Sequence, residues 1–452
     1  SEVLEMAFLS RRSESASVIP TGVEVDVMVE QVVVSGPDLL QIPTQLPERA
    51  LVEAPITGSI TLDTEGPIAE LVTEVLERSV ELRASDIHVE PGENRLIIRI
   101  RVDGVLEELM NLPATQAAPF VSRLKVLARI NIVERRRPQD GQFTVQIKNR
   151  PIDVRLATVA TLYGEKAVMR LLDTNRTLTT LQGLGMSERH YDLFQKMVTS
   201  QHGLVISTGP TGSGKTTTLH SALQEIDFSN LNVSTIEDPV EYIVPGINHI
   251  PVVDDIGIGF ATQLRALLRQ DPDVILVGET RDSETARISV QAALSGRLVL
   301  TSLHATDALS TIYRLFQMEI EPYLVAASLR GVVSQRLIRK NCDACAEEYY
   351  ANEFEKMQLF GEMNFNLVTL RRGVGCDECR GTGYKDRLGV FQILDITEEM
   401  REVISTRPDP TVLAAAARAQ GLKTLEEEAY AQVIAGKTTI EEVRRLVVSD
   451  GK

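Results

Sequence analysis

A glycine-rich segment of eight residues limits most strongly what this chain can fold into. Residues 203–208 (GLVIST) form an apolar, β-branched run that is typical of a buried strand. The sequence GPTGSGKT follows at once and matches the P-loop pattern G-x-x-x-x-G-K-[ST] at every fixed position. Residues 217–226 can then form a helix. Strand, P-loop and helix in this order predict an α/β domain with a parallel sheet that binds a nucleotide. The P-loop residues are Gly209, Pro210, Thr211, Gly212, Ser213, Gly214, Lys215 and Thr216.

The P-loop residue types have defined uses in phosphate binding. The glycines let backbone N–H groups face phosphate oxygens, and the helix N-terminus adds a favourable dipole. Lys215 can reach the β- and γ-phosphates during catalysis, and the Thr216 hydroxyl can ligate Mg²⁺. The alternative, a chance glycine-rich turn, is disfavoured by the strand before it and the helix after it. We therefore expect ATP and Mg²⁺ as cofactors, bound by the P-loop and by Thr217.

An acidic residue follows a second short apolar run. Asp273 precedes the sequence VILVGE, so Glu279 emerges just beyond a predicted buried strand. In P-loop proteins a carboxylate in this place orients the attacking water or supports Mg²⁺. The alternative is an exposed acid at a strand end with no part in the chemistry. We expect Glu279 to be the acidic partner of the P-loop.

The length of the chain indicates how many domains it has, and its net charge disfavours some kinds of binding partner. A chain of 452 residues is too long for one compact core, so two or three domains are expected. The net charge of -16 and the pI of about 5.0 disfavour a dedicated nucleic-acid binder and direct binding to anionic lipid. No apolar stretch approaches the roughly 20 residues that span a bilayer, and residues 1–12 lack a signal-peptide pattern. We expect a cytoplasmic protein.

Hydrophobic patterns divide the chain into three regions. Residues 1–65 show no strong helical period and are punctuated by prolines, so we interpret them as an arm or a domain remnant. Residues 66–175 combine helical patterns with hairpin signals such as Asp103-Gly104, which predicts an α+β domain. Residues 185–452 alternate apolar strands with amphipathic helices, which predicts the α/β nucleotide-binding domain. Within it we expect an insertion at residues 341–384 and C-terminal helices at residues 395–452.

All the cysteines lie in that insertion, as two C-x-x-C pairs. In a reducing compartment such clustering favours a metal over disulfides. Four thiolates suit tetrahedral Zn²⁺, and a site with no open position is structural. A redox C-x-x-C is the alternative, but it does not require two pairs. We predict a structural Zn²⁺ site formed by Cys342, Cys345, Cys376 and Cys379.

Further motifs resemble those of one known family, the type II secretion and type IV pilus assembly ATPases. The resemblance runs from about residue 67 to the C-terminus, and the motifs follow one another in the family's order. It implies a RecA-like motor domain preceded by a PAS-like α+β domain. The motifs are RASDIHVEP (residues 83–91), VDG (102–104), RPQDG (137–141), IEDPVE (236–241), RQDPD (269–273) and LVLTSLHATD (298–307).

The resemblance implies roles for acidic residues and for one histidine. Glu279 would be the catalytic Walker B glutamate. Glu237, Asp238 and Glu241 would form an acidic cluster near Mg²⁺ and the γ-phosphate, and the alternative for them is a strand end followed by a proline turn. His304 would sense the γ-phosphate or hold a group near it, and the alternative is a structural histidine.

Arginines would complete the site, because planar guanidinium groups stabilise charge that develops on the γ-phosphoryl oxygens. By motif position the family's arginines from the preceding domain correspond to Arg155 and Arg170. Arg265, ahead of the Walker B strand, would be a third, and each could instead be a surface ion-pair partner. One departure is visible, because Arg297 stands where the family usually has the first His of its histidine box. The role of that His is either dispensable or carried by a guanidinium group.

The resemblance also implies an assembly. Its members act as rings docked on a membrane complex, so the expected partners are further copies of this chain in a hexamer and inner-membrane secretion or pilus platform proteins. The membrane contact would be indirect, at the inner face of the cytoplasmic membrane. The cysteine insertion points to the assembly or secretion branch, since the retraction ATPases lack it. We predict an ATP hydrolase of type II secretion, with type IV pilus assembly as the alternative.

Two other classes stay open. A nucleic-acid translocase is disfavoured by the missing basic balance, and turnover stimulated by nucleic acid would revive it. A nucleotide-gated scaffold would bind ATP without hydrolysing it, and the intact set of Lys215, Thr216 and Glu279 argues against it.

Overall fold

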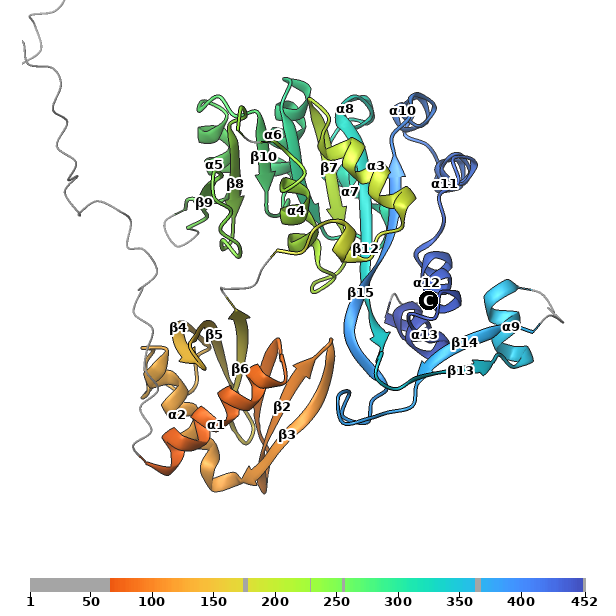
Figure 1. The fold of residues 1–452 in the computed structure, drawn as a ribbon. Helices are drawn as coiled ribbons and strands as arrows, with labels where there is room; N and C mark the ends of the chain where they lie inside the picture. Colours follow the sequence, from red (N-terminus) through yellow and green to blue (C-terminus); the bar gives the residue numbers. More distant parts are fainter. Residues whose placement is uncertain (1–65, 174–177, 228, 254–256, 362–366, 450–452) are drawn as a thin grey trace, which may run out of the picture. The chain divides into compact units, whose positions relative to one another are not determined.

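The computed structural model of the chain describes residues 66–173, 178–227, 229–253, 257–361 and 367–449. The predicted arm at residues 1–65 lies outside the described residues. Two large sheets organise the described part, one within residues 66–173 (the α+β region) and one within residues 178–449 (the α/β region), and a small two-stranded sheet lies in the cysteine insertion (Figure 1). No helix in the described ranges is both long enough and apolar enough to cross a membrane.

The α+β region is a six-stranded antiparallel sheet with the strand order β3-β2-β1-β6-β5-β4. Alternate residues of its strands are buried, such as Leu96, Ile98 and Ile100, and they share one core with helix residues such as Leu76 and Leu124. The elements are α1 (Pro67–Glu81), β1 (Asp86–Pro91), β2 (Arg95–Val102), β3 (Val105–Pro113), η1 (Ala114–Gln116), α2 (Ala117–Leu127), β4 (Gln139–Ile147), β5 (Arg150–Thr161) and β6 (Gly164–Asp173).

The predicted hairpin turn lies between β2 and β3. Asp103 and Gly104 have φ values of 48° and 82°. Positive φ at both central residues is what a tight hairpin needs to match the twist of its strands. The Asp-Gly signal therefore predicted this connection correctly.

The α/β region has a seven-stranded sheet with the order β15-β12-β7-β11-β10-β8-β9. The predicted parallel pairing holds from β12 to β9, and β15 runs antiparallel to β12 at the edge. The sheet strands are β7 (Gly203–Thr208), β8 (Val233–Glu237), β9 (Asn248–Pro251), β10 (Val274–Val277), β11 (Leu298–Leu303), β12 (Leu329–Asn341) and β15 (Tyr384–Asp395).

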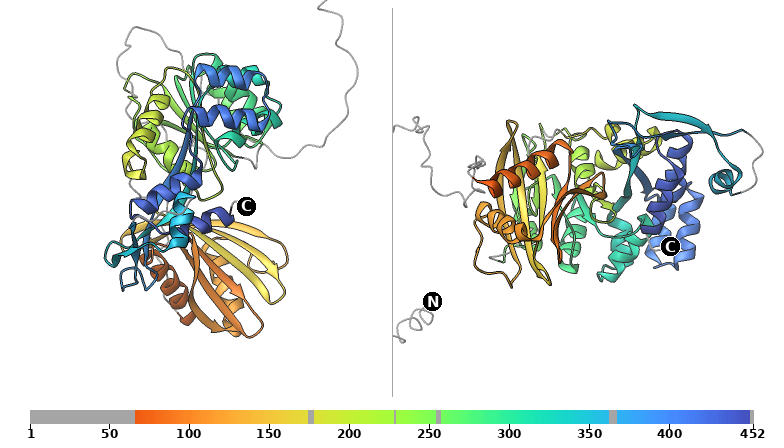
Figure 2. Two further views of the ribbon diagram at one scale, coloured as in Figure 1. Left: turned by 90° about the vertical axis from the view of Figure 1, so that its right-hand side faces the viewer. Right: turned by 90° about the horizontal axis from the view of Figure 1, so that it is seen from below.

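Helices cover both faces of this sheet (Figure 2). Leu204 and Ile206 of β7 pack on one side, while Val205 packs on the other. Strands buried on both faces are apolar throughout, which explains why β7, β10 and β11 could be predicted as continuous runs. On the first face lie α5 (Phe260–Leu267), α6 (Ser283–Leu294), α7 (Ala308–Gln317), α8 (Pro322–Ser328), α10 (Glu398–Ser405) and α11 (Pro410–Ala419), and on the second lie α3 (Glu188–Val198), after η2 (Gln182–Leu184), and α4 (Lys215–Leu223).

The cysteine-rich insertion connects the long strands β12 and β15 (Figure 1). It contains a two-stranded sheet and one short helix. Ile338 and Val390 of the long strands share a core with Ala429 and Val443 of the C-terminal helices. The remaining elements are β13 (Ala346–Tyr350), α9 (Glu353–Phe360), β14 (Thr369–Gly373), α12 (Leu425–Ile434) and α13 (Ile440–Ser449).

Candidate functional site

The P-loop forms a tight turn between β7 and α4. Gly209 has a φ of 149°, and a Cβ there would lie 2.6 Å from the carbonyl oxygen of Gln335, so only glycine fits. Gly214 is the N-cap residue of α4, also at positive φ. The P-loop thus leads directly into the first turn of α4, where the backbone N–H groups of a helix lack intrahelical partners and can bind an anion.

Two side chains of the P-loop fit a phosphate ligand. The Lys215 Nζ donates to the carbonyl oxygens of Gly209 at 3.0 Å and Pro210 at 3.1 Å. Burial lowers the pKa of Lys215 to about 8, although the Glu279 carboxylate favours the protonated form. The Ser213 hydroxyl is buried and has no hydrogen-bond partner among the described residues. Phosphate oxygens would accept from both groups, so the residues present suit the predicted ATP.

Glu279 emerges beyond the end of β10, as predicted, and lies between the Arg281 guanidinium and the His304 ring. One carboxylate oxygen is 3.2 Å from His304 Nε2, and the other is 3.0 Å from Arg281 Nε. Arg281 also donates to the Asp238 carboxylate at 3.3 Å. The side chains of Glu279 and His304 are 24% and 49% exposed. This carboxylate is therefore fixed in place yet reachable by water or by a cation.

Glu237, at the end of β8, is in a different setting, because its side chain is fully buried. One of its oxygens accepts from Thr235 Oγ1 at 2.6 Å and from His249 Nδ1 at 3.0 Å. The other oxygen is 3.2 Å from His220 Nε2. Burial opposes ionisation, but the contacts with His220 and His249 hold the pKa of Glu237 at about 2. Glu237 is thus a buried, ionised carboxylate.

The predicted acidic cluster is therefore divided between two environments. Glu237 is buried, whereas Asp238 and Glu241 are exposed. Asp238 is linked to Glu279 through Arg281. The part of the cluster that can meet a nucleotide directly is the exposed pair.

The predicted arginines differ in their surroundings. Arg155 and Arg170 are opposite one another on β5 and β6, and both line a cavity of about 550 Å³. Arg170 is 3.3 Å from the Asp86 carboxylate. Burial lowers the pKa of Arg155, and the Glu241 carboxylate is the strongest influence that raises it. The two arginines thus line the same cavity of the α+β region.

Among the described residues, neither Arg265 nor Arg297 forms a hydrogen bond or ion pair with the P-loop residues or with Glu279. Arg265 forms an ion pair with Glu284 on the surface formed by α5 and α6. Arg297 precedes β11 and donates to Ser295. Since β11 is parallel to β7, Arg297 is at the end of the strand opposite to the P-loop and to His304. Arg297 therefore lies away from the P-loop of its own chain.

Four residues of this neighbourhood were not predicted from the sequence. They are Arg281, His220, His249 and Arg336, the last a buried arginine that donates to the carbonyl oxygens of Gln335 and Thr306. A signal existed only for Arg281, which stands two residues after Glu279 in the same turn. The two histidines come together only through the pairing of β8 with β9 and the packing of α4.

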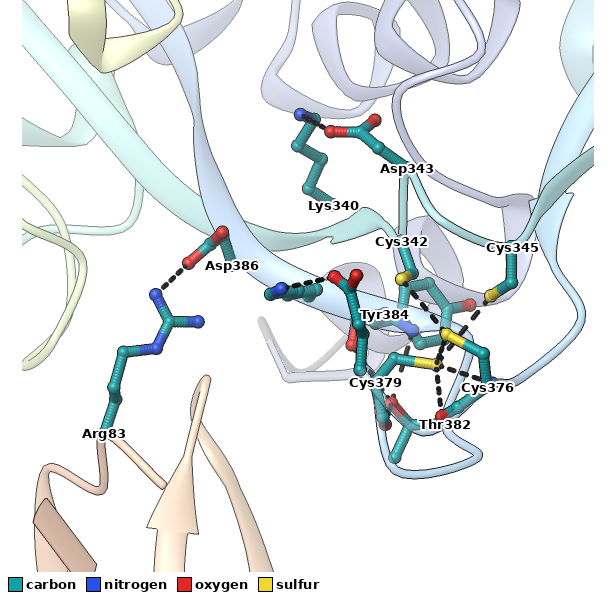
Figure 3. Close-up of polar contacts among 12 residues, drawn as sticks. Arg83, Lys340, Cys342, Asp343, Cys345, Cys376, Cys379, Thr382, Tyr384 and Asp386 are labelled. Atoms are coloured by element: carbon teal, nitrogen blue, oxygen red, sulfur yellow. Dashed lines mark hydrogen bonds and ion pairs between the residues drawn. The ribbon is translucent and has the colours of Figure 1, made fainter. Parts of the chain in front are cut away.

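The four cysteines meet in the insertion, as predicted (Figure 3). The Sγ–Sγ distances are 3.8 Å for Cys342–Cys376, 3.8 Å for Cys345–Cys379 and 3.7 Å for Cys376–Cys379. Tetrahedral zinc with Zn–S bonds of about 2.3 Å would separate its sulfurs by about 3.8 Å. The donor set and its spacing therefore fit Zn²⁺.

The backbone around the cysteines is also arranged for thiolates. Gly375 N–H donates to Cys345 Sγ at 3.3 Å, and the N–H groups of Cys376 and Gly383 donate to Cys379 Sγ, each at 3.2 Å. Desolvation opposes the charge, but the N–H groups of Cys376 and Gly383 lower the pKa of Cys379 to about 6, whereas desolvation raises the pKa of Cys342 and raises that of Cys345 to about 12. Such donors stabilise sulfur in the charged form that a metal requires.

Comparison with known proteins agrees with this geometry. Residues 61–445 match the family described as "Type II/IV secretion system protein". The chain is 43% identical over 384 residues to the type II secretion system protein E of Pseudomonas aeruginosa, covering 85% of this chain and 76% of that protein. It is 40% identical over 393 residues to the type IV pilus assembly ATPase PilB of Thermus thermophilus, covering 86% of this chain and 44% of that protein.

A solved structure shares the fold. The ATPase DotB of Legionella pneumophila superposes with a TM-score of 0.63 at 21% identity, covering 86% of this chain and 99% of DotB. The family match and the identity to the secretion protein confirm the resemblance inferred from the motifs at residues 83–91, 102–104, 137–141, 236–241, 269–273 and 298–307. This chain belongs to the type II/IV secretion system protein family and is a P-loop secretion ATPase.

Proposed function

We propose that this chain hydrolyses ATP to power type II protein secretion, as a hexameric ring. The observation that carries the proposal is the position of Glu279. Its carboxylate stands at the same sheet edge as the P-loop, paired with the Arg281 guanidinium, in contact with His304 and still reachable from solvent. The identity of 43% to a type II secretion system protein E supports the choice of process.

The described residues suggest how the reaction proceeds. The P-loop N–H groups and Lys215 bind the phosphates, and Thr216 would ligate Mg²⁺, which would neutralise phosphate charge. Glu279 orients and activates the attacking water. Lys215, with Arg155 and Arg170, stabilises the charge that develops on the γ-phosphoryl oxygens. Hydrolysis then shifts the α+β region against the α/β region, which converts chemical energy into rigid-body motion.

The remaining predictions concern assembly and stability. The ring binds platform proteins at the inner face of the cytoplasmic membrane and drives assembly of pilin-like subunits. Zn²⁺ on the four cysteines stabilises the insertion without a part in hydrolysis, because all four positions of the metal are filled by sulfur. The predicted domain boundaries at residues 66–175, 185–452 and 341–384 belong to this proposal too.

Type IV pilus assembly is the second candidate. The observation in its favour is the identity of 40% to a pilus assembly ATPase, close to the value for the secretion protein. A nucleic-acid translocase receives no such support, and the net charge of -16 disfavours it.

Gene deletion in the source organism separates the two candidates. Exoprotein release and surface pili are assayed in the deletion strain and after complementation with the wild-type gene or with Glu279→Gln. We expect secreted enzymes to stay in the cell while pili persist, with rescue by the wild-type gene only. Loss of pili with normal secretion would establish pilus assembly instead. Full rescue by Glu279→Gln would contradict ATP hydrolysis as the driving reaction.

A further inference from the structure

A buried polar cluster joins three elements of the α/β region beside the P-loop. It consists of His220 on α4, Thr235 and Glu237 on β8, and His249 on β9, and we call it the His–Glu clasp. His220 and Glu237 are fully buried, and His249 nearly so. Neither histidine has a part in the proposed mechanism.

The hydrogen-bond partners define the protons of the clasp. His220 Nδ1 is 3.0 Å from the Thr216 carbonyl oxygen and Nε2 is 3.2 Å from the Glu237 carboxylate. Both partners can only accept, so both ring nitrogens carry protons and His220 is an imidazolium. Its contact with Glu237 is an ion pair rather than a well-aligned hydrogen bond, since Nε2 has no hydrogen-bond partner among the described residues.

His249 has the opposite arrangement and is neutral. Its Nε2 accepts the backbone N–H of Val244 at 3.0 Å, so the ring proton is on Nδ1 and is donated to Glu237. Two histidines and a carboxylate resemble a metal site, but a metal on Nδ1 would need the lone pair that this proton occupies. The clasp is therefore a buried ion pair of zero net charge, in which Thr235 and His249 hydrogen-bond one oxygen of Glu237 and the His220 ring lies against the other.

The clasp is connected to the exposed acids of the site. Thr216 and His220 belong to the P-loop helix, and the Tyr242 ring lies 5.2 Å from the His220 ring while its hydroxyl is 3.4 Å from Thr217 Oγ1. The segment 238–247, which carries Asp238 and Glu241, is thereby packed on α4. Its other end is held by the bond from Val244 to His249.

A second connection leads to the catalytic carboxylate. Asp238 directly follows Glu237 and is 3.3 Å from Arg281, which is 3.0 Å from Glu279. A shift at the end of β8 would move Asp238 and, through Arg281, disturb Glu279. This route needs no direct contact between the clasp and a nucleotide.

We propose that His220 and Glu237 are positioning residues, which hold segment 238–247 against the P-loop helix and so place Asp238, Glu241 and Glu279 for hydrolysis. Glu237 then acts through its neighbours and does not touch the nucleotide. The inference deepens the proposed function and rests on it. It leaves the exposed acids as the ones that face ATP and Mg²⁺.

The test compares His220→Leu, Glu237→Gln and the double variant in the full chain. Titration with fluorescent ADP counts the sites that bind nucleotide, and phosphate release is expressed per such site. We expect each single variant to lose at least tenfold in kcat per binding site, with a Kd for ADP within threefold of wild type. The double variant should lose no more than the worse single variant, because all three break one clasp.

His190→Leu is the matched control, since His190 is another largely buried histidine of the same region, near Glu428 and outside the site. We expect its kcat per binding site to stay within twofold of wild type. If His220→Leu behaves like this control despite a lower melting temperature, the clasp is merely structural and the inference fails. A loss above a hundredfold in Glu237→Gln with less than threefold in His220→Leu would show that Glu237 acts on the nucleotide itself.

Amide hydrogen exchange gives a readout that does not depend on turnover. We expect segment 240–247 to exchange several-fold faster in His220→Leu than in wild type, and to be unchanged in His190→Leu. Unaltered protection in His220→Leu would overturn the inference. A wild-type chain that never hydrolyses ATP, with the expected change in exchange, would refute the proposed function and leave the clasp standing.

Discussion

The sheet edge that carries the P-loop (the nucleotide edge) and the cysteine site both bring together side chains that can bind a ligand. They differ in whether solvent can reach the ligand position. The nucleotide edge collects the P-loop, Glu279 and His304 from the ends of three strands, and its carboxylate is partly exposed. The cysteine site collects four sulfurs that all lie within 4.8 Å of one another, and they would fill every position of a tetrahedral zinc ion. An open site can exchange water and ligands, whereas a closed one can only hold its ion. We therefore expect damage to the first to reduce activity and damage to the second to reduce stability.

The largest expected effect is that of Glu279→Gln, which keeps the shape of the side chain and removes its charge. Without the carboxylate no group activates the water, so we expect kcat to fall by about 10²- to 10³-fold, while the Kd for ADP and the melting temperature stay near wild type. Phosphate release, nucleotide titration and thermal unfolding measure the three quantities. Glu284→Gln, at an exposed acid paired with Arg265, is the control and should remain active. If the melting temperature of Glu279→Gln falls together with its kcat, the nucleotide site also contributes to stability. The distinction between an activity site and a stability site would then be wrong.

Removal of the metal should have the converse effect. Cys379→Ser removes one of four sulfurs, and because metal binding stabilises only the folded site, we expect a loss of several kcal/mol in the free energy of unfolding. Zinc analysis should give one ion per wild-type chain and much less in the variant, and denaturant unfolding gives the stability. ADP binding at low temperature should be retained. Zinc-free wild-type protein with unchanged stability would contradict the structural role.

A smaller effect is expected from Arg281→Gln, which separates Asp238 from Glu279 without removing either acid. We expect a loss of about tenfold in kcat, equivalent to about 1.4 kcal/mol of transition-state stabilisation. Arg265→Gln is the matched comparison, since its guanidinium pairs with Glu284 at the surface. A loss in Arg265→Gln as large as that in Arg281→Gln would support the prediction that Arg265 completes the site, and an unchanged kcat would support the surface ion pair.

The smallest expected effect is that of His190, which lies outside both sites. It makes the free energy of unfolding depend on pH. Burial, with the charges of Arg189 and Lys423, lowers the pKa of His190 to about 4. Between pH 6.5 and 4 the unfolded chain therefore binds a proton that the folded chain does not, so stability falls as the pH falls. We expect a loss of about 1 kcal/mol between pH 7.5 and 5.5 that is reduced in His190→Gln. Denaturant midpoints at both pH values test this, and equal losses in the two proteins would contradict it.

The sequence predicted those parts of the molecule that are local. The P-loop, the Asp103-Gly104 turn and the cysteine pairs depend on short spacings, and each takes the predicted form. The continuous apolar runs predicted the buried strands for the same reason. The antiparallel direction of β15 at the sheet edge was not predicted, because strand direction depends on how the insertion returns the chain, which no local pattern records.

The site was predicted less completely than the fold. Glu279 and His304 meet as expected, but the motif IEDPVE gives no sign that Glu237 is buried while Asp238 is exposed. Adjacent residues at a strand end point to opposite sides, and which side is interior depends on α4 and β9. His220 and His249 are far from each other in the sequence, so their meeting at Glu237 could be seen only in the structure.

Single-turnover hydrolysis of γ-labelled ATP shows whether the ring hydrolyses the nucleotide that it binds. Full-length protein in excess over ATP is separated by size into ring and smaller species, and labelled phosphate is followed with Mg²⁺ and with a chelator. The account predicts phosphate release from the ring fraction only in Mg²⁺, and none from Glu279→Gln although it binds ATP. ATP that is bound by wild-type rings and stays intact would instead identify a nucleotide-gated scaffold and contradict the account.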